Sequence, residues 1–139
     1  MKSRPTARGF TLIELVIAMA ILAIITTIAY ASYSNQIQHS RRSDALTSVG
    51  GISSSLERCY AQAYTYLGCG NAAAGTTASR NGYYSIATVL AATTYTLTAK
   101  PVGGQAGDTT CASFILSNSG QSATNTGGAD ETTTCWGSR

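Results

Sequence analysis

Side chains that could carry acid–base or metal chemistry are scarce in this sequence of 139 residues. It has one histidine, His39, and only 11% of its residues are charged. Its four cysteines form no C-x-x-C pair and are far from His39 in sequence, which argues against a zinc site. The acidic residues Glu57, Asp108, Asp130 and Glu131 lack the spacing of a calcium loop. We therefore predict no metal and no cofactor.

Motifs for catalysis and for nucleotide binding are also missing from the sequence. Serines are abundant, but they form no recognisable set of nucleophile, base and orienting residue. No glycine-rich phosphate loop opens a helix. We therefore predict that the chain is not an enzyme.

The excess of basic charge is confined to the start of the chain. Nine Lys and Arg residues against six Asp and Glu give a formal charge of +3, but Lys2, Arg4 and Arg8 lie within the first nine residues. The remainder carries six basic and six acidic side chains. Bulk charge therefore gives no support for nucleic-acid binding, and nucleic acid is not among the partners that we expect from the composition.

A continuous apolar run, GFTLIELVIAMAILAIITTIAY, extends from Gly9 to Tyr30 and contains a single charge, Glu14. About 20 apolar residues suffice for a helix to cross a bilayer core. The basic flank before the run predicts that the N-terminal end stays on the cytoplasmic side. An ionisable group within the apolar core costs about 2.5–3.5 kcal/mol or more, so Glu14 is expected to have a function and a partner.

These residues resemble the start of the type IV pilin family. The shared pattern is a short basic leader, Ala7-Arg8-Gly9, then Phe10, then Thr11 to Leu15 with the letters TLIEL. The resemblance implies cleavage between Gly9 and Phe10 by a prepilin peptidase and methylation of the new amino group of Phe10. A secretory signal would instead be cleaved after the apolar run and discarded.

The resemblance also implies a partner for Glu14, which is the freed amino group of Phe10 on a neighbouring subunit. Such a pair would be satisfied only after assembly and would set the axial register between subunits, a well-attested use of a buried charge pair. A protonated Glu14, or one whose side chain reaches the membrane interface, is the alternative.

Beyond Tyr30 the chain keeps a helical period, which predicts one long helix from about Phe10 to about Tyr64 with an amphipathic second half. The apolar positions of this stripe are Ile37, Leu46, Val49, Ile52, Leu56, Cys59, Tyr60, Ala63 and Leu67. Gly50-Gly51 indicates either a close backbone approach to a sheet, which we favour, or a local bend. The family often has a proline near Ala31, and its absence here removes the support for a kink or for local melting on assembly.

Charged residues cluster in the segment Ser40 to Ala45, SRRSDA, between the apolar run and the rest of the chain. We interpret Arg41, Arg42 and Asp44 as a solvated helix face with short-range charge pairing. Contact with lipid headgroups or with an adjacent subunit is the alternative.

The second half of the chain is typical of antiparallel β-structure after a loop at 67–80. Strands are expected at 82–86, 93–100 and 111–118, followed by a polar stretch at 121–132 and a closing segment, Thr133 to Trp136. Tyr95, Leu97 and Ala99 alternate with threonines and should face the helix. One helix stripe and one sheet face make a two-layer α+β fold, the fold that the resemblance to type IV pilins also implies.

All four cysteines, at positions 59, 69, 111 and 135, follow the apolar run, which suggests disulfides on the outer side of the membrane. Four cysteines allow three connectivities. We expect Cys111–Cys135, a position that the family often bridges and that would tie the polar C-terminal loop to the sheet. We also expect Cys59–Cys69, which would join the helix end to the following loop.

The expected organisation is a leader at 1–9, a transmembrane or filament-core helix at 10–30, an amphipathic helix at 31–66 and a periplasmic head at 67–139. Further blocks resemble the minor-pilin subgroup named PilE, namely Ser40 to Ala45, Thr94 to Pro101, Cys111 to Leu116 and Cys135-Trp136.

The resemblance implies a structural subunit of a type IV pilus, and more specifically a minor pilin. Its partners would be other pilin subunits, the prepilin peptidase, the pilus assembly machinery and, before assembly, the inner membrane. It would span that membrane once, with its head in the periplasm, and then enter the extracellular filament. A type II secretion pseudopilin, a DNA-uptake pilin and a membrane-anchored enzyme remain as alternatives.

Overall fold

The computed structural model describes residues 9–69 and 75–137, so the expected leader residues 1–8 and part of the expected loop at 67–80 lie outside the described residues. The chain divides into two units, one ending at Gln36 and one beginning at Ile37. Helix α1, Leu12–Ala63, starts in the first unit and ends in the second. The helix expected from Phe10 to Tyr64 is thus confirmed, although it begins two residues later.

The end of α1 is marked by an unusual backbone conformation. Tyr64 has φ = 54°, the left-handed conformation that often ends a helix and that glycine normally adopts. Its N–H still donates to the carbonyl oxygen of Tyr60 at 2.8 Å. This turn reverses the chain so that the N–H of Tyr66 reaches the carbonyl oxygen of Ala92, 3.0 Å away.

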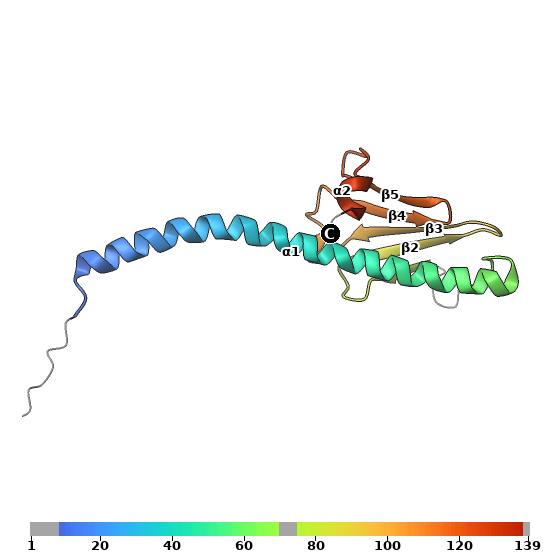
Figure 1. The fold of residues 1–139 in the computed structure, drawn as a ribbon, viewed down its shortest axis with the longest axis horizontal. Helices are drawn as coiled ribbons and strands as arrows, with labels where there is room; N and C mark the ends of the chain where they lie inside the picture. The colour runs from blue at the N-terminus through green and yellow to red at the C-terminus, as the bar shows by residue number, and fades with distance from the viewer. Residues whose placement is uncertain (1–8, 70–74, 138–139) are drawn as a thin grey trace, which may run out of the picture. The chain divides into compact units, whose positions relative to one another are not determined.

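The second unit, which we call the head, contains a five-stranded antiparallel sheet in the order β1-β2-β3-β4-β5 (Figure 1). Each strand pairs with its neighbour in sequence, so short connections suffice and no crossover is needed. The strands are β1 Gly75–Ala78, β2 Tyr84–Leu90, β3 Tyr95–Pro101, β4 Ser113–Ser117 and β5 Gly120–Thr124. A short 3-10 helix, η1 Gly103–Gln105, follows β3, and a short helix, α2 Thr132–Trp136, follows β5.

The core lies between the head part of α1 and one face of the sheet. On β3 the buried residues are Tyr95, Leu97 and Ala99, so the predicted inward face is confirmed. They pack in one cluster with helix residues such as Val49 and Leu56, both of which are almost fully buried. The two-layer α+β fold predicted from the sequence is therefore confirmed.

Three expectations about the C-terminal half are wrong. Strand β1 lies inside the segment expected to be a loop, and β5 begins at Gly120 and continues into the polar stretch at 121–132. The segment expected to close the β-structure forms α2 instead, with the N–H of Cys135 donating to the carbonyl oxygen of Glu131 at 2.8 Å. Both missed strands consist of small and polar residues, and their pairing with β2 and β4 supplies the order that local propensity does not.

The close backbone approach expected at Gly50-Gly51 is also not found. A Cβ atom added to either glycine would meet no atom within 4 Å beyond the helix itself. Both residues lie inside α1, where a pair of glycines costs about 2 kcal/mol of helix propensity relative to two alanines. Packing inside the head therefore does not account for them.

Candidate functional site

The N-terminal motif forms a capped helix start. The N–H and Oγ1 of Thr11 donate to Oε2 of Glu14 at 2.9 and 2.8 Å, and the N–H of Glu14 donates back to Oγ1 of Thr11 at 3.3 Å. This reciprocal arrangement is a capping box, and it places the first helical residue at Leu12. Gly9 and Phe10 precede the helix and are exposed. The pattern T-x-x-E was visible in the sequence, so the role of Thr11 could have been predicted.

The helix that follows this cap is apolar on all sides and unburied within the first unit. An 18-residue window of α1 has a mean hydropathy of 2.6 and none of it is buried. By length and composition α1 is the one helix in the described residues that could cross a membrane, a criterion that signal sequences also meet. The hydroxyls of Thr26 and Thr27 donate to the carbonyl oxygens of Leu22 and Ile24, at 2.6 and 2.7 Å, so these polar groups are satisfied within the helix.

The segment Ser40 to Ala45, which we expected to be a solvated helix face, instead binds α1 to loops of the head. Arg42 is buried and makes a bidentate pair with Asp108, with Nε–Oδ2 and Nη2–Oδ1 distances of 2.6 and 2.7 Å. Gln105 Nε2 and the N–H of Cys111 also donate to Asp108, at 3.0 and 3.1 Å. Burial alone would raise the pKa of Asp108, but the bonds from Arg42 and Cys111 hold it below its ordinary value.

A second contact joins the same helical turn to the β1–β2 turn. Asp44 is buried and accepts hydrogen bonds from the hydroxyl of Ser79 and from the N–H and Nδ2 of Asn81. Arg41 lies over the ring of Tyr83, with its Cζ atom 4.7 Å from the ring centroid. Arg41 Nη1 also donates to the carbonyl oxygen of Gly104 at 3.0 Å. The interpretation of this segment as a solvated face is therefore wrong, because its charged side chains bind two loops of their own head.

Sequence reasoning missed Asp108 because nothing in its neighbourhood marks it as a partner. It is separated from Arg42 by 66 residues, and in the sequence it is one of several dispersed acidic residues. The remaining acidic residues have local roles, since Glu57 accepts a hydrogen bond from the hydroxyl of Tyr66 and Asp130 from the hydroxyl of Thr132. No cluster of three His, Cys, Asp or Glu side chains among the described residues could hold a metal ion.

Two disulfides close the far ends of the head. Cys59 near the end of α1 is bonded to Cys69, and Cys111 before β4 is bonded to Cys135 in α2. The Cα atoms are 5.8 Å apart in both pairs, an ordinary spacing. These are the pairs expected from the sequence.

Removing either disulfide by serine substitution should destabilise the head by about 3 kcal/mol, with the Cys111–Cys135 bridge costing about 0.8 kcal/mol more than Cys59–Cys69. The difference follows from their sequence separations of 24 and 10 residues, because a longer closed loop restricts the unfolded chain more. Chemical unfolding of the two double-serine variants measures both values. Equal stability of wild type and either variant would contradict the prediction.

The comparisons with known proteins agree on one family. A model described as the prokaryotic N-terminal methylation motif matches residues 4–30, and one described as type IV minor pilin ComP, DNA uptake sequence receptor, matches residues 31–115. The second match alone covers more than half of the chain. The chain belongs to the type IV pilin family.

Curated relatives of this pilin include three fimbrial proteins. It is 36% identical to the fimbrial protein EcpC of Eikenella corrodens over 85 residues, which are 61% of this chain and 55% of EcpC. It is 40% identical over 52 residues to the type IV major fimbrial protein FimA of Dichelobacter nodosus, covering 37% of this chain and 33% of FimA. A fimbrial protein of Moraxella nonliquefaciens is 38% identical over 60 residues, with 39% of each chain covered. The pilin thus spans between a third and just over half of the length of these relatives.

Proposed function

We propose that this pilin is a structural subunit of a type IV pilus, and that within the pilus it is a minor one. The observation that carries the proposal is the combination of an unburied apolar helix with a capped start directly after Gly9 and Phe10. An apolar surface of this extent has to be covered by lipid or by other helices. In a subunit that moves from the membrane to the filament, lipid covers the apolar helix in the first state and the helices of other subunits cover it in the second.

We propose that the chain is first inserted in the inner membrane as a precursor, with the head in the periplasm. A prepilin peptidase cuts between Gly9 and Phe10, and the freed amino group of Phe10 is methylated. The assembly machinery then packs α1 against the helices of other pilins. The match of residues 4–30 to the N-terminal methylation motif supports this order. The chain's own role is packing and surface display rather than catalysis.

Glu14 is proposed to pair with the amino group of Phe10 on a neighbouring subunit and so to set the register between helices. In the described structure its carboxylate is satisfied by Thr11 of the same chain. The capping box therefore gives Glu14 a local partner in the absence of a neighbour. This lowers the cost of holding the carboxylate at the edge of an apolar segment.

The test of the proposed role is recovery of the chain in filaments. An epitope-tagged full-length chain is expressed in a piliated host that lacks its own copy, and surface filaments are sheared off and probed. The chain should appear in the sheared fraction and disappear from it in a strain without the assembly ATPase. A chain that stays in the envelope of piliated cells would contradict the proposal, and would favour a secretion pseudopilin.

A second candidate function is DNA uptake, because the model matching residues 31–115 is described as a DNA uptake sequence receptor. The exposed cations of the described head are few, and they lie on different elements, with Arg58 on α1, Arg80 in the β1–β2 turn and Lys100 on β3. Three phosphate contacts would give a slope of log K against log salt of about −2.7 on duplex DNA. Titrating filaments with labelled duplex at several salt concentrations tests this candidate, and binding absent at physiological salt would remove it.

A further inference from the structure

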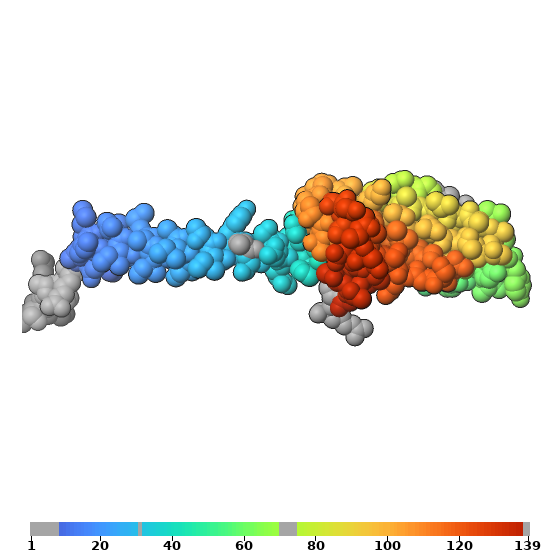
Figure 2. Space-filling model, turned by 90° about the horizontal axis from the view of Figure 1, so that it is seen from above, coloured from blue at the N-terminus to red at the C-terminus, as the bar shows by residue number. Residues whose placement is uncertain are grey.

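Two tyrosines stand at the end of the apolar part of α1. Tyr30 and Tyr33 are the only Phe, Tyr or Trp residues between Phe10 and Tyr60 in the sequence. Their side chains are 75% and 66% exposed. Because they lie three positions apart, they project from the same side of the helix, and both line one shallow groove on its surface. Figure 2 shows this part of α1, in blue to cyan, as a bare rod of side chains in that view. The fold therefore gives neither ring a place in a core.

The composition of the sequence changes at this pair. Residues 12–30 are apolar apart from Glu14 and two threonines, whereas residues 31–40, ASYSNQIQHS, are mostly polar and include no Lys, Arg, Asp or Glu. At a rise of about 1.5 Å per residue, the two tyrosines lie about 27 and 32 Å along the helix from Leu12. The hydrocarbon core of a bilayer is about 30 Å thick. With Leu12 at the inner boundary of the core, the two tyrosines fall on either side of the outer boundary.

A tyrosine side chain is suited to such a boundary. Its ring is apolar and packs against acyl chains, while its hydroxyl can donate a hydrogen bond to the ester and headgroup oxygens of lipids. Tyrosine and tryptophan are enriched at both faces of a membrane for this reason. A position at the lipid interface would therefore account for two large, exposed rings between an apolar and a polar segment.

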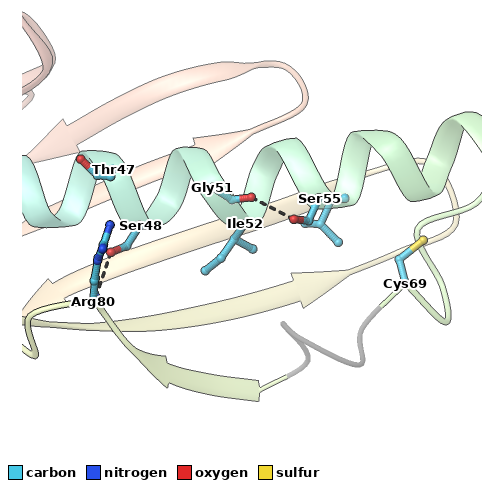
Figure 3. Close-up of a pocket in the computed structure, with 8 residues that line it drawn as sticks. Thr47, Ser48, Gly51, Ile52, Ser55, Cys69 and Arg80 are labelled. Atoms are coloured by element: carbon cyan, nitrogen blue, oxygen red, sulfur yellow. Dashed lines mark hydrogen bonds between the residues drawn. The ribbon is translucent and has the colours of Figure 1, made fainter.

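Basic side chains are the other common anchors at a membrane interface, and the next ones in this sequence are bound to the head. Arg42 is buried in its ion pair, and Arg41 stacks on Tyr83. Arg80 follows later in the chain, in a turn that its own N–H fixes to Oγ of Ser48 at 3.1 Å (Figure 3). The tyrosines are therefore the side chains best placed in the sequence to bind lipid at the outer boundary.

We propose that Tyr30 and Tyr33 bind the glycerol and headgroup region of lipids at the periplasmic face of the inner membrane. The pair sets the depth at which the pilin is held in the membrane before assembly. This inference rests on the first step of the proposed function, the insertion of α1 in the inner membrane. It does not require that the chain enter a filament.

The test maps the outer boundary of the helix with single added cysteines. All four native cysteines are paired in disulfides, so an added cysteine is the only free thiol of the full chain. Ala29→Cys and Ser34→Cys place that thiol before and after the tyrosine pair. The tagged strain without the assembly ATPase keeps the chain in the membrane, and its spheroplasts are treated with a membrane-impermeant maleimide. We expect fast labelling at position 34 and slow labelling at position 29.

Replacing both tyrosines with leucine should move the outer boundary along the helix. Tyr30→Leu together with Tyr33→Leu lengthens the apolar run by about one helical turn, so the helix can lie about 5 Å deeper. Labelling at position 34 should then fall by about tenfold. Tyr30→Trp together with Tyr33→Trp keeps two interfacial rings and should preserve the wild-type labelling of both positions.

The matched control is Thr26→Leu together with Thr27→Leu. It also adds two leucines to the apolar run, but it leaves the tyrosine pair in place, so labelling at positions 29 and 34 should not change. The same chains dissolved in detergent give the intrinsic reactivity of each thiol. Dividing the rate in spheroplasts by this value leaves the effect of depth alone.

Separate results would overturn the inference and the proposed function. Unchanged labelling in the leucine variant would show that another part of the chain sets the depth, and slow labelling of wild type at position 34 would place the rings inside the core or under another protein. Either result overturns the inference. A chain absent from the inner-membrane fraction would contradict both. A chain labelled as expected but missing from the filaments of piliated cells would contradict the proposed function alone.

Discussion

Replacing Arg42 with alanine is expected to reduce the free energy of unfolding of the head by about 3–5 kcal/mol, the cost of leaving a buried charge without its partner. Asp108 is almost fully buried in the wild-type chain, and without Arg42 it would keep only the donors Gln105 and Cys111. The loop between β3 and β4 would then lose its main attachment to α1. Chemical unfolding of the full chain in detergent, followed by tyrosine and tryptophan fluorescence, measures the change.

The matched control for this prediction is Arg41→Ala, one residue away on the same helix. Arg41 stacks on Tyr83 and donates to Gly104 without being fully buried, so its removal should cost about 1 kcal/mol or less. Equal decreases in the free energy of unfolding in the two variants would contradict the prediction that the bidentate pair contributes more than the contacts of Arg41.

Acid should reproduce part of the Arg42→Ala effect in the wild type. The pKa of Asp108 is lower in the folded chain than its ordinary value of 3.8, so its ionised form stabilises the fold. That stabilisation is complete above the unfolded-state pKa and is lost as the pH falls through the lowered folded-state pKa. Asp108→Asn should therefore flatten the dependence of stability on pH below about 4.

Replacing Glu14 with valine is expected to leave membrane insertion intact and to reduce incorporation into filaments by at least about tenfold. The substitution makes the apolar run more hydrophobic, so insertion has no reason to fail. It removes the carboxylate proposed to meet Phe10 of a neighbour. Comparing the envelope and sheared fractions of the tagged strain gives both quantities.

The capping box complicates this test, because Glu14 also caps its own helix. Thr11→Ala separates the two roles, since it removes the hydroxyl contacts and keeps the charge. Loss of a cap costs about 1 kcal/mol, so Thr11→Ala should have a small effect beside that of Glu14→Val. Equal defects in the two variants would mean that helix capping, rather than register, explains the role of Glu14.

Features written in a continuous stretch of sequence could be predicted. The apolar run predicts one helix by its length, whereas the amphipathic stripe after it and the alternation of Tyr95, Leu97 and Ala99 each carry a period that fixes one face of one element. The long helix, the two-layer fold and the inward face of β3 were all predictable for this reason.

Features that depend on distant partners could not be predicted. The segment Ser40 to Ala45 looks like an exposed charged turn, and only the fold shows that Asp108 and the β1–β2 turn lie against it. Strand β1 has only Thr76 and Thr77 to suggest a strand, and its antiparallel pairing with β2 is what makes it one. We interpreted Gly50-Gly51 as a point of close packing. A glycine pair in the sequence does not distinguish a close approach of another backbone from open space beside the helix.

The central claim is that α1 is trimmed at its start and then exchanges lipid for the helices of other pilins. Mass spectrometry of the N-terminal peptide from sheared filaments tests it most directly. The account predicts a peptide that begins at Phe10 and carries a methyl group on its amino nitrogen. A peptide from the filaments that begins at Met1, or one cut after Tyr30, would contradict it.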